Sequence, residues 1–195
     1  MAYELKPLPA QIGVFNQYIA RQTETIVLKE KILSLSGDSF DVLLANGQPL
    51  LKVKGKFFTL GSRKSVYDTN GTHLFDIYRE LMHLHTTYVL EDPKGNKFFE
   101  LKNNIQIFGT SATAKFATIT TGKLESLTMK GNWLDTRGDI TDDTGHVVAR
   151  IDRKLLNARQ LLFDQDSYGV VVAPGMDMAI VAAMCICLDD KANDK

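Results

Sequence analysis

The hydrophobic pattern of the chain is most distinctive near its C-terminal end. Residues 168–173 read as a β-branched strand, Pro174-Gly175 interrupts the run, and residues 178–188 are then apolar at every position. A surface helix would carry a polar stripe every three or four residues, and this segment has none. The run is also shorter than the roughly 20 apolar residues that span a bilayer. We therefore predict a helix enclosed on all sides, with Asp177 at its N-cap or in its first turn, where a carboxylate accepts unpaired backbone N–H groups.

Most of the preceding chain has the pattern of short strands. Runs rich in β-branched and aromatic residues alternate with Gly, Asn, Asp and Pro. Gly47, Gly71 and Gly95 follow one another at a constant spacing of 24 residues. Asn-Gly and Asp-x-x-Gly sequences supply the positive φ that tight hairpins need, so this spacing indicates a repeated hairpin unit.

Many short strands followed by one wholly apolar helix have few ways to pack. A closed barrel removes exposed sheet edges, and a large barrel has an interior that must be filled. The sequence therefore predicts a mainly β fold, a closed antiparallel barrel around a central C-terminal helix. Asp189 and Asp190 would mark the point where the helix leaves the barrel for solvent. No linker or change of composition divides residues 1–195, so we expect a single domain with its core at about residues 12–190.

Composition and charge limit the classes of function. Lys plus Arg and Asp plus Glu both number 23, so no net field attracts nucleic acid or an acidic membrane. The N-terminus lacks a basic segment followed by an apolar one, which predicts a cytoplasmic protein without a transmembrane segment, either free or peripheral at a membrane surface. Cys185 and Cys187 lie within the apolar run and are expected to be small buried hydrophobes.

Sequence motifs for catalysis are absent. The chain contains no G-x-S-x-G, H-E-x-x-H or G-x-G-x-x-G, and its Gly-Lys pairs lack the rest of a P-loop. We therefore expect no enzyme activity, no catalytic residues and no cofactor. His83 and His85 would share one face of a strand, but no third ligand accompanies them, so no metal site is predicted either.

One stretch carries candidate binding residues. Lys52, Lys54 and Lys56 alternate with other positions, so on a strand they share the face that points away from the core. Arg63 and Lys64 follow, and no acidic residue lies between Lys52 and Lys64. Five cations together could bind a phosphorylated headgroup through charge-assisted hydrogen bonds. The alternative is a solvated strand face whose charges discourage edge pairing.

Several segments of the chain resemble a known family. Residues 168–180, followed by Leu188-Asp189, are similar to the C-terminal signature of the LURP-one-related family, a branch of the tubby C-terminal-like superfamily. Further matching segments are residues 28–31, 36–40, 67–74, 130–133 and 145–151. The resemblance covers most of residues 12–190 and implies a twelve-stranded β-barrel closed around a central hydrophobic helix.

The functions that this resemblance implies are less uniform than the fold. Tubby proteins bind phosphoinositide headgroups, phospholipid scramblases are related to them, and plant LURP-one members are associated with pathogen defence. We expect a non-enzymatic binding module that engages a phosphoinositide or another anionic ligand on the outer face of the barrel. A protein-interaction or structural scaffold with a protein partner is the alternative. A third hypothesis, scramblase-like membrane activity, would require the apolar helix to leave the barrel.

Overall fold

The computed structural model describes residues 4–31, 39–55, 63–80, 86–104, 110–119, 121–132, 137–152 and 167–193. A short 3-10 helix, η1 (Asn16–Tyr18), precedes the first strand, and helix α2 (Met178–Asn193) follows the last. The strands are β1 (Glu24–Lys31), β2 (Ser39–Leu44), β3 (Pro49–Gly55), β4 (Lys64–Tyr67), β5 (His73–Glu80), β6 (Thr87–Glu91), β7 (Lys97–Asn104), β8 (Thr110–Ala117), β9 (Leu124–Asn132), β10 (Arg137–Thr141), β11 (Val147–Asp152) and β12 (Ser167–Val172).

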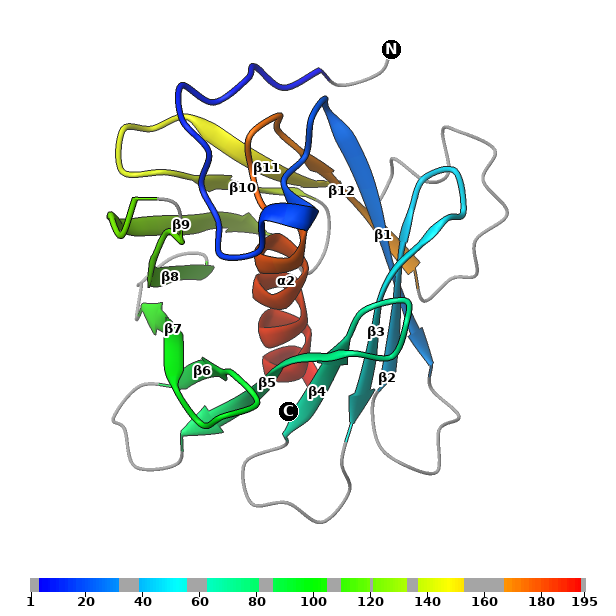
Figure 1. The fold of residues 1–195 in the computed structure, drawn as a ribbon. Coiled ribbons are helices and arrows are strands. Elements are labelled where there is room, and N and C mark those ends of the chain that lie inside the picture. Colours follow the sequence, from blue (N-terminus) through cyan, green and yellow to red (C-terminus); the bar gives the residue numbers. More distant parts are fainter. Residues whose placement is uncertain are drawn as a thin grey trace.

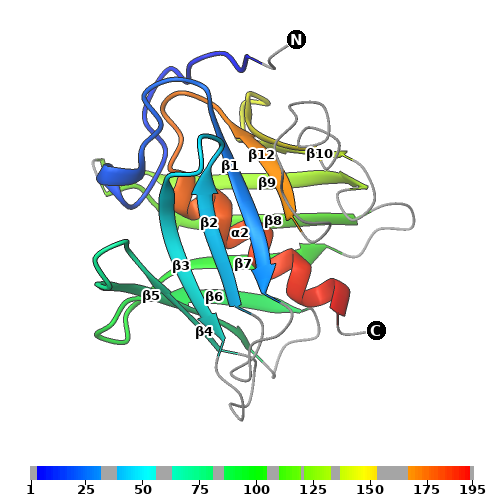
Figure 2. The same ribbon diagram turned by 90° about the vertical axis from the view of Figure 1, so that its right-hand side faces the viewer.

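These strands form one closed barrel around the helix. Each strand pairs antiparallel with its neighbours in sequence, and β1 closes the barrel against β12. Helix α2 runs through the middle of the barrel (Figure 1), and the second view shows strands on its different sides (Figure 2). No residue from Ala179 to Leu188 is more than 1% exposed, as expected of a helix that is apolar all round. The predicted fold is therefore confirmed.

The two ends of the barrel are built differently. At one end, tight turns join β2 to β3, β4 to β5, β6 to β7 and β10 to β11, and each turn contains a glycine with φ between 85° and 90°. In three of these turns an aspartate accepts two backbone N–H bonds through Oδ1; these residues are Asp68, Asp92 and Asp142. The connections at the other end lie largely outside the described residues.

The constant spacing of Gly47, Gly71 and Gly95 reflects a repeated hairpin with a β-bulge, and the hairpin at Gly145 has the same form. In each of these four hairpins the strand register shifts just after the turn. A bulge redirects one side chain, here the apolar residue three positions after the glycine, toward the hydrophobic core. The four residues are Leu50, Leu74, Phe98 and Val148. The repeated hairpins thus close one end of the core with apolar side chains.

The N-terminal segment covers the same end. Ile12 forms a bridge to Met176 just before the helix. The ring of Phe15 stacks on Phe75 with centroids 5.3 Å apart, and it meets the bulge residue Phe98 edge-on at 5.9 Å. In Figure 1 this segment, with η1, lies over the start of α2. Residues ahead of β1 are therefore part of the hydrophobic core.

Asp177 joins that segment to the helix. Its Oδ1 accepts the backbone N–H groups of Ala179 at 2.8 Å and Ile180 at 3.4 Å, which confirms the predicted N-cap. Its Oδ2 accepts those of Val14 at 3.0 Å and Phe15 at 2.8 Å. Burial raises the pKa of Asp177 to about 6, although all four N–H donors oppose this rise. One buried carboxylate thus bonds to two segments that are far apart in sequence.

At the other end of the helix one prediction is wrong. Asp189 was expected at the exit to solvent, but it is only 8% exposed. The hydroxyl of Tyr168, near the start of β12, donates a hydrogen bond of 2.5 Å to its Oδ2. Because a tyrosine from the barrel wall supplies this donor, the helix can bury its first acidic residue.

Candidate functional site

Helix α2 occupies the interior of the barrel, so candidate binding residues must be sought on the outer face. Strand β3 shows the predicted alternation, with Lys52 and Lys54 exposed and Leu51 and Val53 buried. The ammonium group of Lys54 lies 5.0 Å from the centre of the Tyr67 ring on β4, a cation–π distance. Strand β3 therefore presents two neighbouring ammonium groups outward.

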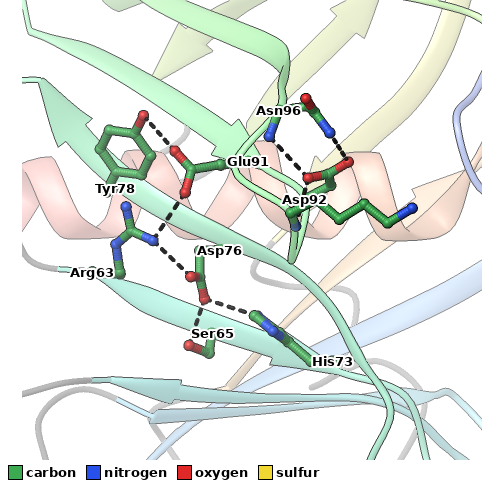
Figure 3. Close-up of polar contacts among 9 residues, drawn as sticks. Arg63, Ser65, His73, Asp76, Tyr78, Glu91, Asp92 and Asn96 are labelled. Atoms are coloured by element: carbon green, nitrogen blue, oxygen red, sulfur yellow. Dashed lines mark hydrogen bonds and ion pairs between the residues drawn. The ribbon is translucent and has the colours of Figure 1, made fainter.

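Arg63 belongs to a different arrangement. Its Nη1 lies 2.8 Å from Oδ2 of Asp76 and 3.3 Å from Oε1 of Glu91 (Figure 3), and its guanidinium carbon lies 4.6 Å from the centre of the Tyr78 ring. Burial would lower the pKa of Arg63, but hydrogen bonds to Asp76 and Glu91 raise it above its usual value. Two carboxylates from β5 and β6 therefore neutralise this cation.

Asp76 is the centre of the same network. Besides Arg63, it accepts hydrogen bonds from Ser65 Oγ at 2.5 Å and His73 Nε2 at 2.9 Å (Figure 3). Burial would raise the pKa of Asp76, but the bonds from Ser65, Arg63 and His73 outweigh it and lower the pKa. In a catalytic triad the serine hydroxyl bonds to the imidazole and the imidazole to the carboxylate, whereas here the hydroxyl and the imidazole both bond to one carboxylate. The network links β4, β5 and β6 and does not form a catalytic triad.

Lys64 points toward the inner face of the barrel, away from the face that carries Lys52 and Lys54. It lies opposite Gly55 and the core residue Ile77, and it is 4% exposed. Strand alternation places it on the inner face together with Val66. Lys56 lies outside the described residues. Of the five predicted binding residues, the structure thus brings Lys52 and Lys54 together on the surface, holds Arg63 in ion pairs, and buries Lys64.

A pocket of about 480 Å³ lies beside Lys52, between the β2–β3 turn and the β4–β5 turn. Its charged lining residues are Asp41, Lys52 and Asp68, and its polar ones include Gln48 and Thr69. The pKa of Asp68 is lowered, mainly by the hydrogen bond that the backbone N–H of Thr72 donates to it. The sequence did not reveal Asp41 and Asp68 as neighbours of Lys52, because they belong to a different strand and turn.

Two other kinds of site can be assessed over the described ranges. There, no three His, Cys, Asp or Glu side chains gather as the ligands of a metal ion. His83 and His85 lie outside those ranges. Nor does the described part of the chain contain a helix with the length and apolar character required to cross a bilayer.

Comparison with known proteins places this architecture among relatives. The sequence model described as LURP-one-related matches residues 24–189. Protein LURP-one-related 15 of Arabidopsis thaliana is 24% identical over 200 residues, which cover 94% of this chain and 88% of the relative. The uncharacterized protein YxjI of Bacillus subtilis is 26% identical over 164 residues, which cover 84% of this chain and 91% of that protein. A crystal structure of a protein from Arabidopsis thaliana shares the fold, with a TM-score of 0.60, 18% identity, and coverage of 94% of this chain and 99% of that one.

Proposed function

The chain belongs to the LURP-one-related family, and from that premise we propose that it is a non-enzymatic binding module for an anionic group on the outer face of β3. The observation that carries the proposal is the state of Lys52 and Lys54. Both are exposed on one face, and among the described residues neither ammonium group pairs with a carboxylate. Lys97 and Lys123, in contrast, form ion pairs with Glu80 and Glu125.

The strand geometry suits a phosphorylated ligand. Residues two apart on a strand are separated by about 7 Å, so two lysine side chains can converge on one phosphate. Each would donate charge-assisted hydrogen bonds to its oxygens. Phosphoinositide headgroups are the form of ligand that the tubby resemblance implies. A module of this kind would act in the cytoplasm or at a membrane surface.

Vesicle flotation tests this proposal. Wild-type chain is expected to float with vesicles that contain phosphoinositide more than with phosphatidylcholine alone, and Lys52→Glu with Lys54→Glu should abolish the difference. Lys115→Glu with Lys130→Glu is the matched control, because both lysines are exposed on strands β8 and β9. Loss of binding in the control as well would indicate a diffuse charge effect, and equal flotation of the wild type with both vesicles would contradict a phosphoinositide ligand.

A protein-interaction scaffold remains the second candidate, and one observation favours it. Ile119 and Leu124, beside the β8–β9 turn, are 63% and 78% exposed. This turn lies on the side of the barrel away from β3 (Figure 1). This function would be supported by a protein that binds stoichiometrically to the wild type and to the variant with Lys52→Glu and Lys54→Glu, but does not bind to Leu124→Ser.

The third candidate, scramblase-like activity, would require α2 to leave a barrel that encloses it on all sides. Scrambling by reconstituted protein with α2 disulfide-linked to the barrel wall would contradict that requirement.

A further inference from the structure

The pocket beside Lys52 has the size of a small-molecule site. Its volume of about 480 Å³ falls within the ordinary range of such sites, about 300–1,000 Å³. Tight turns form its two sides, and Asp68 braces one of them by accepting the backbone N–H groups of Asn70 at 2.9 Å and Thr72 at 2.7 Å. These two bonds hold the turn on that side of the pocket.

The charges in this pocket do not match a polyanion. One ammonium group, Lys52, lies among two carboxylates, Asp41 and Asp68. A ligand with several phosphates that docked on Lys52 would bring its remaining phosphates toward those carboxylates, and like charges at short range repel. A ligand with one anionic group and one cationic group meets a partner for each.

The lining also indicates which cation fits. A primary ammonium donates three hydrogen bonds, and Asp41, Asp68, Gln48 and Thr69 all carry side-chain oxygens that can accept them. A quaternary ammonium is recognised by aromatic faces, and none of the residues that line the pocket has a ring of this kind. Leu43 and Pro49 add apolar surface that suits a short aliphatic linker.

We propose that this pocket binds a zwitterion in which a phosphate ester and a primary ammonium are joined by a short aliphatic linker, as in phosphoethanolamine. Lys52 contacts the phosphate, and Asp41 and Asp68 contact the ammonium. The assignment rests on the proposed function, because it uses Lys52 as the anion contact, and it narrows the ligand class. The same chemistry occurs in the headgroup of phosphatidylethanolamine and in free phosphoethanolamine.

Calorimetric titration of the full chain with three probes tests the assignment. The probes are O-phosphoethanolamine, inorganic phosphate and an inositol trisphosphate. Wild-type chain should bind O-phosphoethanolamine most tightly. Asp68→Asn should weaken that affinity by about tenfold to a hundredfold, the range expected for one charge-assisted contact, without weakening the affinity for inorganic phosphate. Lys52→Gln should weaken binding of all three probes.

The aspartate variant has a matched control. Asp92 accepts the N–H groups of Lys94 and Asn96 in the next hairpin, as Asp68 does in its own, but it does not line the pocket. An asparagine can hold such a turn, since Asn46 Oδ1 accepts the N–H of Gln48 at 2.9 Å. Asp92→Asn should therefore leave all three affinities unchanged, and melting temperatures will show that each variant is folded.

The outcomes separate this inference from the proposed function. If inositol trisphosphate binds more tightly than O-phosphoethanolamine and Asp68→Asn strengthens it, the zwitterion is wrong while anion binding at Lys52 stands. If Lys52→Gln changes no affinity, or no probe binds, both are overturned. Flotation with phosphatidylethanolamine vesicles but not with phosphatidylcholine alone would identify the lipid headgroup as the source; binding of only the free compound would identify a soluble ligand.

Discussion

The buried N-cap makes the stability of this protein depend on pH in a direction that can be measured. Asp177 has an ordinary pKa of 3.8, and burial raises it to about 6 in the folded chain. The folded state therefore binds the proton more tightly than the unfolded state does. The resulting stability is fully present below the unfolded pKa and is lost as the pH rises through 6. A difference of about two pKa units corresponds to about 3 kcal/mol.

Replacement of Asp177 by Asn removes this titration. Urea unfolding at pH 4, 5, 6 and 7, followed by circular dichroism, should show that the stability difference between wild type and variant changes by about 2 kcal/mol across the range, since the last part of the titration lies below pH 4. The stability of the wild type relative to Asp177→Asn should be greatest at pH 4. The variant should still be destabilised at neutral pH, because an amide cannot accept from all four N–H donors and a buried N–H without a partner costs about 1–3 kcal/mol.

A control and a contrary outcome make the test sharp. Hydrogen bonds from Asn96 lower the pKa of the exposed Asp92, so its contribution is present above the unfolded pKa and is lost on acidification. Asp92→Asn should therefore change the pH dependence in the opposite sense. If the wild type instead gains stability over Asp177→Asn as the pH rises, the four N–H donors outweigh burial and the reasoning is refuted.

Three further predictions concern stability. Ile180→Lys should prevent soluble folding, because an unpaired charge in the barrel core costs several kcal/mol. The control Ile180→Val should cost only about 1 kcal/mol. A soluble, cooperatively melting lysine variant would contradict an enclosed helix. Gly13→Ala should lower the free energy of unfolding in urea by about 1–3 kcal/mol, because the added Cβ would lie 2.3 Å from the Cβ of Asp177. Gln11→Ala, at an exposed position, is the control. Equal stabilities of Gly13→Ala and the wild type would show that the N-terminal segment relaxes. Arg63→Gln should lower stability by about 1 kcal/mol at low salt, since its ion pairs are partly exposed, and by less in 1 M salt; no salt dependence would argue against an electrostatic role.

The candidate site was only partly predictable. Alternation along β3 correctly indicated that Lys52 and Lys54 face outward, because strand periodicity is a local property. The same reasoning grouped Arg63 and Lys64 with them because they follow closely in sequence. The start of β4 instead directs Lys64 inward, and Asp76 and Glu91 from later strands engage Arg63. Proximity in sequence does not reveal which residues neighbouring strands bring together.

The fold as a whole, in contrast to the candidate site, could be predicted largely from local patterns in the sequence. By itself, the sequence determined the enclosed helix, the N-cap at Asp177 and the glycine turns, because apolar periodicity, capping and positive φ depend on residues close together in the chain. Only the tertiary structure decided that four bulges close one end of the core, that Asp177 also holds the N-terminal segment, and that Asp41 and Asp68 meet beside Lys52. These features depend on strand register around a closed barrel, which relates residues far apart in sequence and leaves no local pattern.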